Sequence, residues 1–166
     1  MTKLLLIRHG IAEEFRPGLP DSERALTEEG WSKTRSAMTG LVLRGFIPSR
    51  GISSPYRRAM DSMACLKEAA MAVDPKHAFP VGVSDGFTPG ADVEEMDQWL
   101  RRLVINAREN EIIAFTSHEP FLSSLIRHLT AQHFNVKKAS CTVIEWTGEA
   151  WKFNLHFRPA ELRGEE

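Results

Sequence analysis

The hydrophobic pattern of the chain alternates between short apolar runs and longer segments of helical periodicity. Apolar residues dominate the segments 3–7 and 111–116, as is typical of strands buried on both faces of a parallel sheet. Shorter strands are expected at 52–54 and near 79–83. Segments with apolar positions at helical spacing are predicted to be helices at 27–45, 55–73, 93–107 and 121–129.

The end of the chain shows a different pattern. Apolar side chains occupy every second position of 151–157, and together with 141–146 this segment predicts a hairpin at the edge of a sheet. Strands that alternate with helices are typical of α/β proteins, so the predicted fold is a three-layer α/β/α sandwich with a largely parallel central sheet. No repeat, low-complexity tract or linker divides the chain, and we expect one domain over residues 1–166.

The composition argues against several broad classes of protein. Hydrophobic residues make up 42% and charged residues 26% of the 166 positions, which is typical of a globular domain. The 21 basic and 22 acidic side chains give a net charge of -1, so we expect no nucleic-acid partner. Cys65 and Cys141 lie far apart without metal-binding spacing, and no apolar stretch suits a signal peptide or a membrane span. These features predict a cytoplasmic protein with reduced thiols and no membrane attachment.

Two histidines come directly after the two long apolar strands. The carboxyl ends of parallel strands meet at one edge of a sheet, where α/β proteins bind their ligands, so His9 and His118 should lie near one another. Arg8 is adjacent to His9, and Arg58 stands near the start of a predicted helix. Arginine binds phosphate oxygens in bidentate fashion, and the free N–H groups of a helix N-terminus add to the attraction. The pattern predicts a phosphate site.

These residues lie in motifs that resemble those of the histidine phosphatase superfamily, and within it the small bacterial phosphohistidine phosphatases of the SixA type. The motifs stand in the family's order: Arg8-His9-Gly10, Leu26-Thr27-Glu28-Glu29-Gly30, Ser54-Pro55-Tyr56-Arg57-Arg58-Ala59, Thr88-Pro89-Gly90-Ala91-Asp92 and Ser117-His118-Glu119-Pro120. The resemblance implies a phosphoglycerate mutase-like fold without a large cap. Asp61-Ser62 departs from the Gln-Thr that is common in the family, which puts contacts at the start of the helix in question.

The resemblance also implies a role for each matched side chain. His9 is expected to be the nucleophile that becomes transiently phosphorylated, while Arg8, Arg58 and His118 hold the phosphoryl oxygens. Arg24 is expected to make a further phosphate contact. A neutral imidazole offers one nitrogen lone pair for in-line attack if a hydrogen bond to its other nitrogen fixes the tautomer. The two arginines and a protonated second histidine would stabilise the transferred group, so we expect neither a metal nor a cofactor.

The proton donor of the wider superfamily has no convincing counterpart in this chain. Gly86-Phe87 stands where the SixA type has Glu-Leu, which leaves Asp85, Asp92 and Glu119 as candidate acids. An alcohol leaving group, with a pKa near that of water at roughly 15.7, needs a proton, whereas the imidazole released from phosphohistidine has a conjugate acid near roughly 6.5. The missing acid favours a substrate with a phosphorus–nitrogen bond.

The sequence therefore predicts a phosphatase that hydrolyses phosphohistidine on a signalling or phosphotransfer protein and releases inorganic phosphate. Two alternatives stay open. One is a phosphomonoesterase that acts on a small phosphorylated metabolite, with Asp85, Asp92 or Glu119 as proton donor. The other is a binding module that has kept the phosphate pocket without turnover. A comparison of phosphohistidine protein with small phosphate esters as substrates separates these hypotheses.

Overall fold

A six-stranded sheet forms the centre of the computed structural model, which describes residues 1–166. The strands, in chain order, are β1 (Thr2–Arg8), β2 (Arg50–Ser53), β3 (Val81–Val83), β4 (Ile112–Ser117), β5 (Cys141–Trp146) and β6 (Trp151–Phe157). The helices are α1 (Glu28–Leu43), α2 (Arg57–Val73), α3 (Val93–Ile105), α4 (Phe121–Thr130) and α5 (Pro159–Leu162), with short 3-10 helices η1 (Asp21–Glu23), η2 (Pro75–His77) and η3 (Asp85–Phe87).

The strands lie in the order β3-β2-β4-β1-β5-β6. The pairs β3 with β2, β2 with β4, and β4 with β1 are parallel, whereas β5 is antiparallel to both β1 and β6. The prediction of a largely parallel sheet that ends in a hairpin is thus confirmed. The central position of β1 explains its uninterrupted apolar run, because the middle of a strand with neighbours on both sides and helices above and below is shielded from water.

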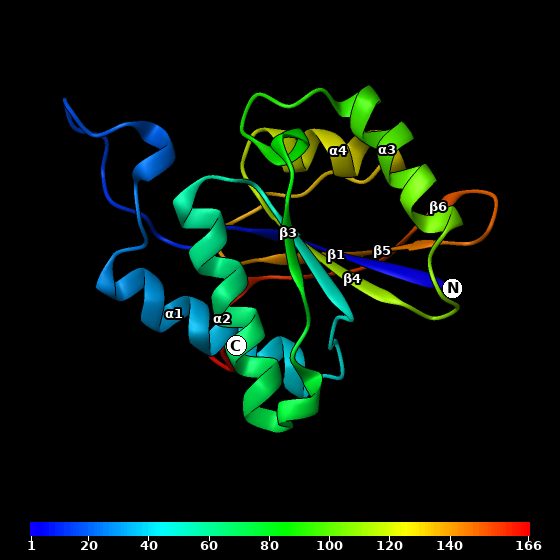
Figure 1. Ribbon diagram of the computed structural model, residues 1–166, viewed down its shortest axis with the longest axis horizontal. Helices are drawn as coiled ribbons and strands as arrows, with labels where there is room; N and C mark the ends of the chain where they lie inside the picture. The colour runs from blue at the N-terminus through cyan, green and yellow to red at the C-terminus, as the bar shows by residue number, and fades with distance from the viewer.

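Helices cover both faces of the sheet (Figure 1). Alternate side chains of β1 divide between the two layers: Leu5 and Ile7 join the core beneath α1 and α2, while Leu4 and Leu6 join the core beneath α3 and α4. All four side chains are fully buried or nearly so. This arrangement confirms the predicted three-layer α/β/α sandwich. No helix combines the length and the apolar composition that a membrane crossing requires.

Several element boundaries differ by one or two residues from the sequence prediction, and two of these differences have a clear cause. The second helix begins at Arg57 instead of 55, because Tyr56 is still extended and its N–H donates to Ser54 Oγ at 3.2 Å. The strand expected near 79–83 is limited to Val81–Val83, the part that pairs with β2. Helix α5 was not predicted, since four residues are too few to show a helical period.

Candidate active site

A cavity of about 220 Å³ opens at the carboxyl ends of β1 and β4, the edge predicted for the site. Its lining consists of Arg8, His9, Ala12, Arg24, Arg58, His118, Glu119 and Lys138. The structure thus brings together the expected nucleophile His9 and the four residues expected to bind phosphate, Arg8, Arg24, Arg58 and His118. The ends of the two strands are tied directly, because His9 N–H donates to Ser117 O at 3.1 Å, and the rings of His9 and His118 lie 5.1 Å apart between centroids.

His9 is held as a neutral imidazole whose ring lone pair is on Nε2. Its Nδ1 lies 2.7 Å from Gly10 O, an acceptor only, so Nδ1 carries the proton and donates it. Nε2 is then unprotonated and accepts from Arg58 Nε at 3.3 Å. Burial, together with the charges of Arg58 and Arg8, lowers the pKa of His9 to about 3. The tautomer that in-line attack requires is therefore the one that the backbone fixes.

His118 is 1% exposed, and its ring packs against the rings of His9 and Tyr56. Its Nε2 lies 2.8 Å from Ser54 Oγ, while its buried Nδ1 has no hydrogen-bond partner within the protein. Burial, together with the charge of Arg58, lowers the pKa of His118 to about 3. Burial therefore favours a neutral ring in this structure, and the protonated second histidine expected for phosphoryl transfer stays a prediction. The sequence could not show how completely the side chain is enclosed by its own domain.

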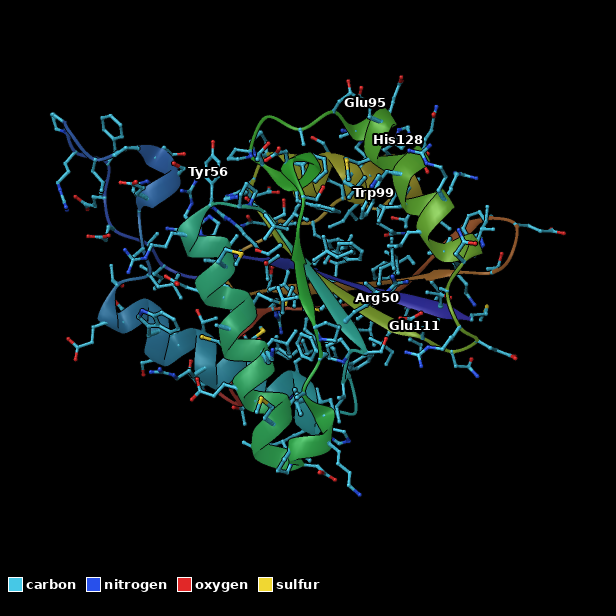
Figure 2. All side chains as sticks on the ribbon, viewed as in Figure 1. Arg50, Tyr56, Glu95, Trp99, Glu111 and His128 are labelled. Atoms are coloured by element: carbon cyan, nitrogen blue, oxygen red, sulfur yellow. The ribbon has the colours of Figure 1, made fainter.

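Arg58 is the most deeply buried arginine of the cavity, at 3% exposed. Its Nε donates to His9 Nε2, its Nη1 to Asp21 O at 2.7 Å and its Nη2 to Asp21 Oδ2 at 3.2 Å. The guanidinium also lies 5.0 Å from the centre of the Tyr56 ring. Figure 2 shows Tyr56 at the start of α2, beside the loop that carries η1.

The other two arginines keep part of their donor capacity. Arg8 donates from Nη1 to Val136 O at 2.9 Å, but its Nε is buried and has no partner within the protein. Arg24 donates from Nε to Asp21 Oδ1 at 2.8 Å and from Nη1 to Glu13 O at 2.7 Å. Because buried polar groups are normally paired, the orphaned N–H of Arg8 marks a position suited to an anionic oxygen.

The departure from the family pattern at Asp61-Ser62 does not remove the contacts at the start of α2. Ser62 Oγ accepts from Gly10 N at 3.0 Å and donates to Arg58 O at 2.8 Å. Asp61 Oδ2 accepts from Leu26 N at 3.3 Å. These bonds join the segment after β1 to α2, so the backbone beside His9 is fixed by the helix that carries Arg58.

Only one of the three candidate acids reaches the cavity. Asp92 caps α3 by accepting from Glu95 N at 3.0 Å, and Asp85 lies in η3; neither lines the cavity. Glu119 does line it, and its Oε1 accepts from Ser123 N at 2.7 Å in the first turn of α4. The expectation that Asp85 or Asp92 is the proton donor is therefore corrected: Asp92 caps α3, and Asp85 lies in the turn of η3.

Two residues near the cavity were missed by the sequence reasoning. Asp21, in the loop before α1, accepts hydrogen bonds from both Arg24 and Arg58. Nothing in the sequence around Asp21 indicates these contacts. Lys138 lines the cavity just before β5. A signal for Lys138 did exist, because the amino end of a strand antiparallel to β1 must lie at the same edge as the carboxyl end of β1. No three His, Cys, Asp or Glu side chains gather in a way that would hold a metal ion.

No protein-family model matches the sequence. An uncharacterized protein from Picosynechococcus is 26% identical over 141 residues, which cover 82% of this chain and 81% of the relative. Among solved structures, the protein histidine phosphatase SixA in complex with tungstate superimposes with a TM-score of 0.82 at 20% identity, covering 96% of this chain and 99% of SixA.

Phosphatases with other substrates have the same fold. Phosphoserine phosphatase from Entamoeba histolytica, in complex with 3-phosphoglyceric acid, has a TM-score of 0.70 at 18% identity and covers 98% of this chain and 100% of its own. Mycobacterial glucosyl-3-phosphoglycerate phosphatase has a TM-score of 0.66 at 16% identity, with 92% and 97% covered. The chain therefore has the same fold as these phosphatases, over nearly its whole length and theirs.

Proposed function

We propose that the protein is a metal-independent phosphatase that hydrolyses phosphohistidine through a phospho-His9 intermediate. The observation that carries this proposal is the state of His9: a buried neutral ring whose proton is held on Nδ1 by Gly10 O, with the Nε2 lone pair beside Arg58. Arg8 and His118 complete the same cavity. Nucleophile and phosphate-binding groups are thus preorganised around one point.

In the first step, His9 Nε2 attacks phosphorus in line, and the bond between phosphorus and the substrate nitrogen breaks. The substrate reacts with its ring protonated on the nitrogen that does not carry phosphorus, so the imidazole takes the bonding electron pair and leaves as a neutral ring. In the second step, a water oxygen attacks phospho-His9, the Nε2–phosphorus electrons return to His9, and both protons of the water leave on the phosphate as H2PO4−. Arg8 and Arg58 bind the equatorial oxygens in both steps, which supplies positioning and charge stabilisation.

Phosphohistidine is the proposed substrate because the cavity offers little help to a poor leaving group. Glu119 is its only carboxylate, and one oxygen of that group is occupied by the backbone of α4. The substrate is proposed to be carried by a phosphotransfer or signalling protein, with inorganic phosphate as product. We also propose that residues 1–166 form one domain and that the protein is cytoplasmic, in keeping with the two free, buried cysteines.

The test compares three substrates, a phosphohistidine-bearing phosphotransfer protein, phosphoserine and 3-phosphoglycerate, with wild-type protein and His9→Ala. We expect the highest kcat/KM on phosphohistidine, complete loss of turnover in His9→Ala, and acid-labile phosphate trapped on His9 of the wild type. A strong preference for the esters would remove the phosphohistidine proposal, and label on another residue would remove His9 as nucleophile.

A phosphomonoesterase is the second candidate, favoured by the position of Glu119 in the cavity. Glu119→Gln tests it, because the glutamine oxygen can still accept from Ser123 N while the proton donor is lost. If esters are the substrates, this variant should lose ester hydrolysis, and Asp85→Asn outside the cavity should not. Absence of turnover on every phosphorylated substrate, with phosphate still bound, would instead support a binding module.

A further inference from the structure

Asp21 contacts two arginines of the cavity although it does not line the cavity itself. Its Oδ2 and its backbone oxygen accept from Arg58, and its Oδ1 accepts from Arg24. The residue belongs to η1, in the loop between β1 and α1 that Figure 1 shows projecting from the molecule beside the start of α2. Although its own partial burial would raise it, hydrogen bonds from Arg24 and Arg58 hold the pKa of Asp21 below the usual range, so its carboxylate is charged.

The contacts of Arg58 divide the guanidinium into two edges. Nη1 and Nη2 both donate to Asp21, so Asp21 faces the edge between the two terminal nitrogens. Nε donates to His9 Nε2 at 3.3 Å, so the edge formed by Nε and Nη2 faces the nucleophile. A guanidinium is planar with fixed N–H directions, and fixing one edge orients the other.

Asp21 is itself held in place by the base of its loop. Ala12 and Leu26 form an isolated antiparallel bridge, and Glu13 N donates to Ala25 O at 2.8 Å. Ala25 N donates back to Glu13 Oε1 at 2.9 Å. The loop that carries Asp21 is therefore closed by paired backbone directly beside the cavity, which gives the aspartate a fixed position from which to hold arginine side chains.

We propose that Asp21 is a positioning residue for the phosphoryl-binding arginines: it fixes the terminal edge of Arg58 so that the Nε edge is presented to the phosphoryl group on His9. The inference rests on the proposed function and adds to it a residue outside the matched motifs. Asp21 does not touch the substrate; it acts through Arg58 and, by its second oxygen, through Arg24.

The experiment uses the full chain with Asp21→Ala, Asp21→Asn and the matched control Glu23→Ala, which removes another carboxylate from the same 3-10 helix. Glu23 is exposed and its side chain has no bonded partner. Two readouts are taken, turnover of a phosphohistidine-bearing protein and binding of inorganic phosphate by calorimetry. Thermal melting shows that each variant is folded.

We expect Asp21→Ala to lower kcat by about tenfold to a hundredfold with a smaller change in KM, because misorientation of a catalytic group by an ångström has effects of this size. Phosphate binding should weaken, Asp21→Asn should show an intermediate loss, and Glu23→Ala should match the wild type. In an Arg58→Ala background, Asp21→Ala should add little further loss of kcat, since the residue it positions is gone.

Unchanged kcat and phosphate affinity in a folded Asp21→Ala variant would overturn the proposal. So would tighter phosphate binding, because Asp21 would then compete with phosphate for Arg58, and so would additive losses in the double variant. If the wild type binds phosphate but turns over no substrate, the proposed function fails while weaker phosphate binding by Asp21→Ala still supports the positioning role. A wild type that binds no phosphate overturns both.

Discussion

Arg57 and Arg58 stand side by side at the start of α2, yet only Arg58 reaches the cavity. Arg57 is exposed, whereas the Arg58 guanidinium is buried and bonded to both His9 and Asp21. Successive residues of a helix point about 100° apart, so one side chain of the pair turns inward and the other outward. Substitution of Arg57 removes a positive charge from solvent, and substitution of Arg58 removes one from the cavity, at the same helix start.

Arg58→Ala should lower kcat/KM for phosphohistidine by roughly 10²- to 10³-fold, the loss found when one donor to a developing negative charge is removed. Arg57→Ala is the control and should stay near the wild-type value, because its charge is in solvent. Steady-state kinetics of both variants provide the measurement. A near-normal kcat/KM for Arg58→Ala in a folded protein would falsify its phosphate-binding role.

At the residue scale, the sequence predicts which side chains meet, but it does not predict their protonation state or the residues that position them. His9 and His118 could be placed together because parallel strands end at one edge. The neutral state of His118 depends on burial by α2 and the surrounding loops, which periodicity does not reveal. Asp21 was missed because its partners lie on another element, and Lys138 because the antiparallel direction of β5 was not applied to the site.

Helix α1 packs unusually closely on the backbone that follows His9. Thr27 caps the helix by accepting from Gly30 N at 2.9 Å, and a Cβ placed on Gly30 would lie 2.0 Å from Ile11 O. A Cβ on Gly10 would likewise lie 2.0 Å from Thr34 Oγ1 of the same helix. The motif glycines therefore allow an approach that no other residue permits, and the helix fixes the turn beside the nucleophile.

Gly30→Ala should destabilise the protein by about 1–3 kcal/mol, because the new methyl group meets backbone that must shift. In a freely exposed helix the same change would stabilise by about 1 kcal/mol. Urea denaturation measures the difference, and Gly82→Ala, where a Cβ meets no atom within 4 Å, is the control. We also expect lower kcat, since movement of Ile11 displaces His9. A gain in stability would contradict the close packing of α1.

At the element scale, long periodic segments are predictable and short ones are not. The four long helices show their apolar faces in sequence, and the hairpin shows its alternation. Helix α5 and η1 are each shorter than the period needed to detect them, and both owe their position to contacts with other elements. The start of α2 at Arg57, two residues later than predicted, likewise depends on Ser54, whose hydroxyl accepts a hydrogen bond from the Tyr56 backbone.

At the scale of the whole molecule, the two layers of helices enclose ionisable groups that the unfolded chain exposes to water. The pKa of both His9 and His118 is about 3 in the folded protein, against about 6.5 for an exposed histidine. Between these values the unfolded chain binds a proton at each histidine and the folded protein does not. Folding stability from this source is complete above about pH 6.5 and is lost as the pH falls towards 3.

The free energy of unfolding should therefore decrease as the pH is lowered from 6.5 to 5, and His118→Gln should decrease less steeply. Each proton taken up only on unfolding contributes a slope of about 1.4 kcal/mol per pH unit in the middle of its range, so the variant should lose about one such proton. Carboxylates with lowered pKa values, such as Asp21 and Glu111, lose their stabilising charge at more acidic pH. Asp61, whose pKa burial raises, is present in both proteins and cancels in the comparison. His156, whose pKa burial also lowers, contributes equally to both proteins and cancels in the comparison.

Urea denaturation at several pH values in this window is the measurement. Parallel slopes for wild type and His118→Gln would mean that the His118 ring is already protonated when folded, and the neutral site described above would have to be abandoned.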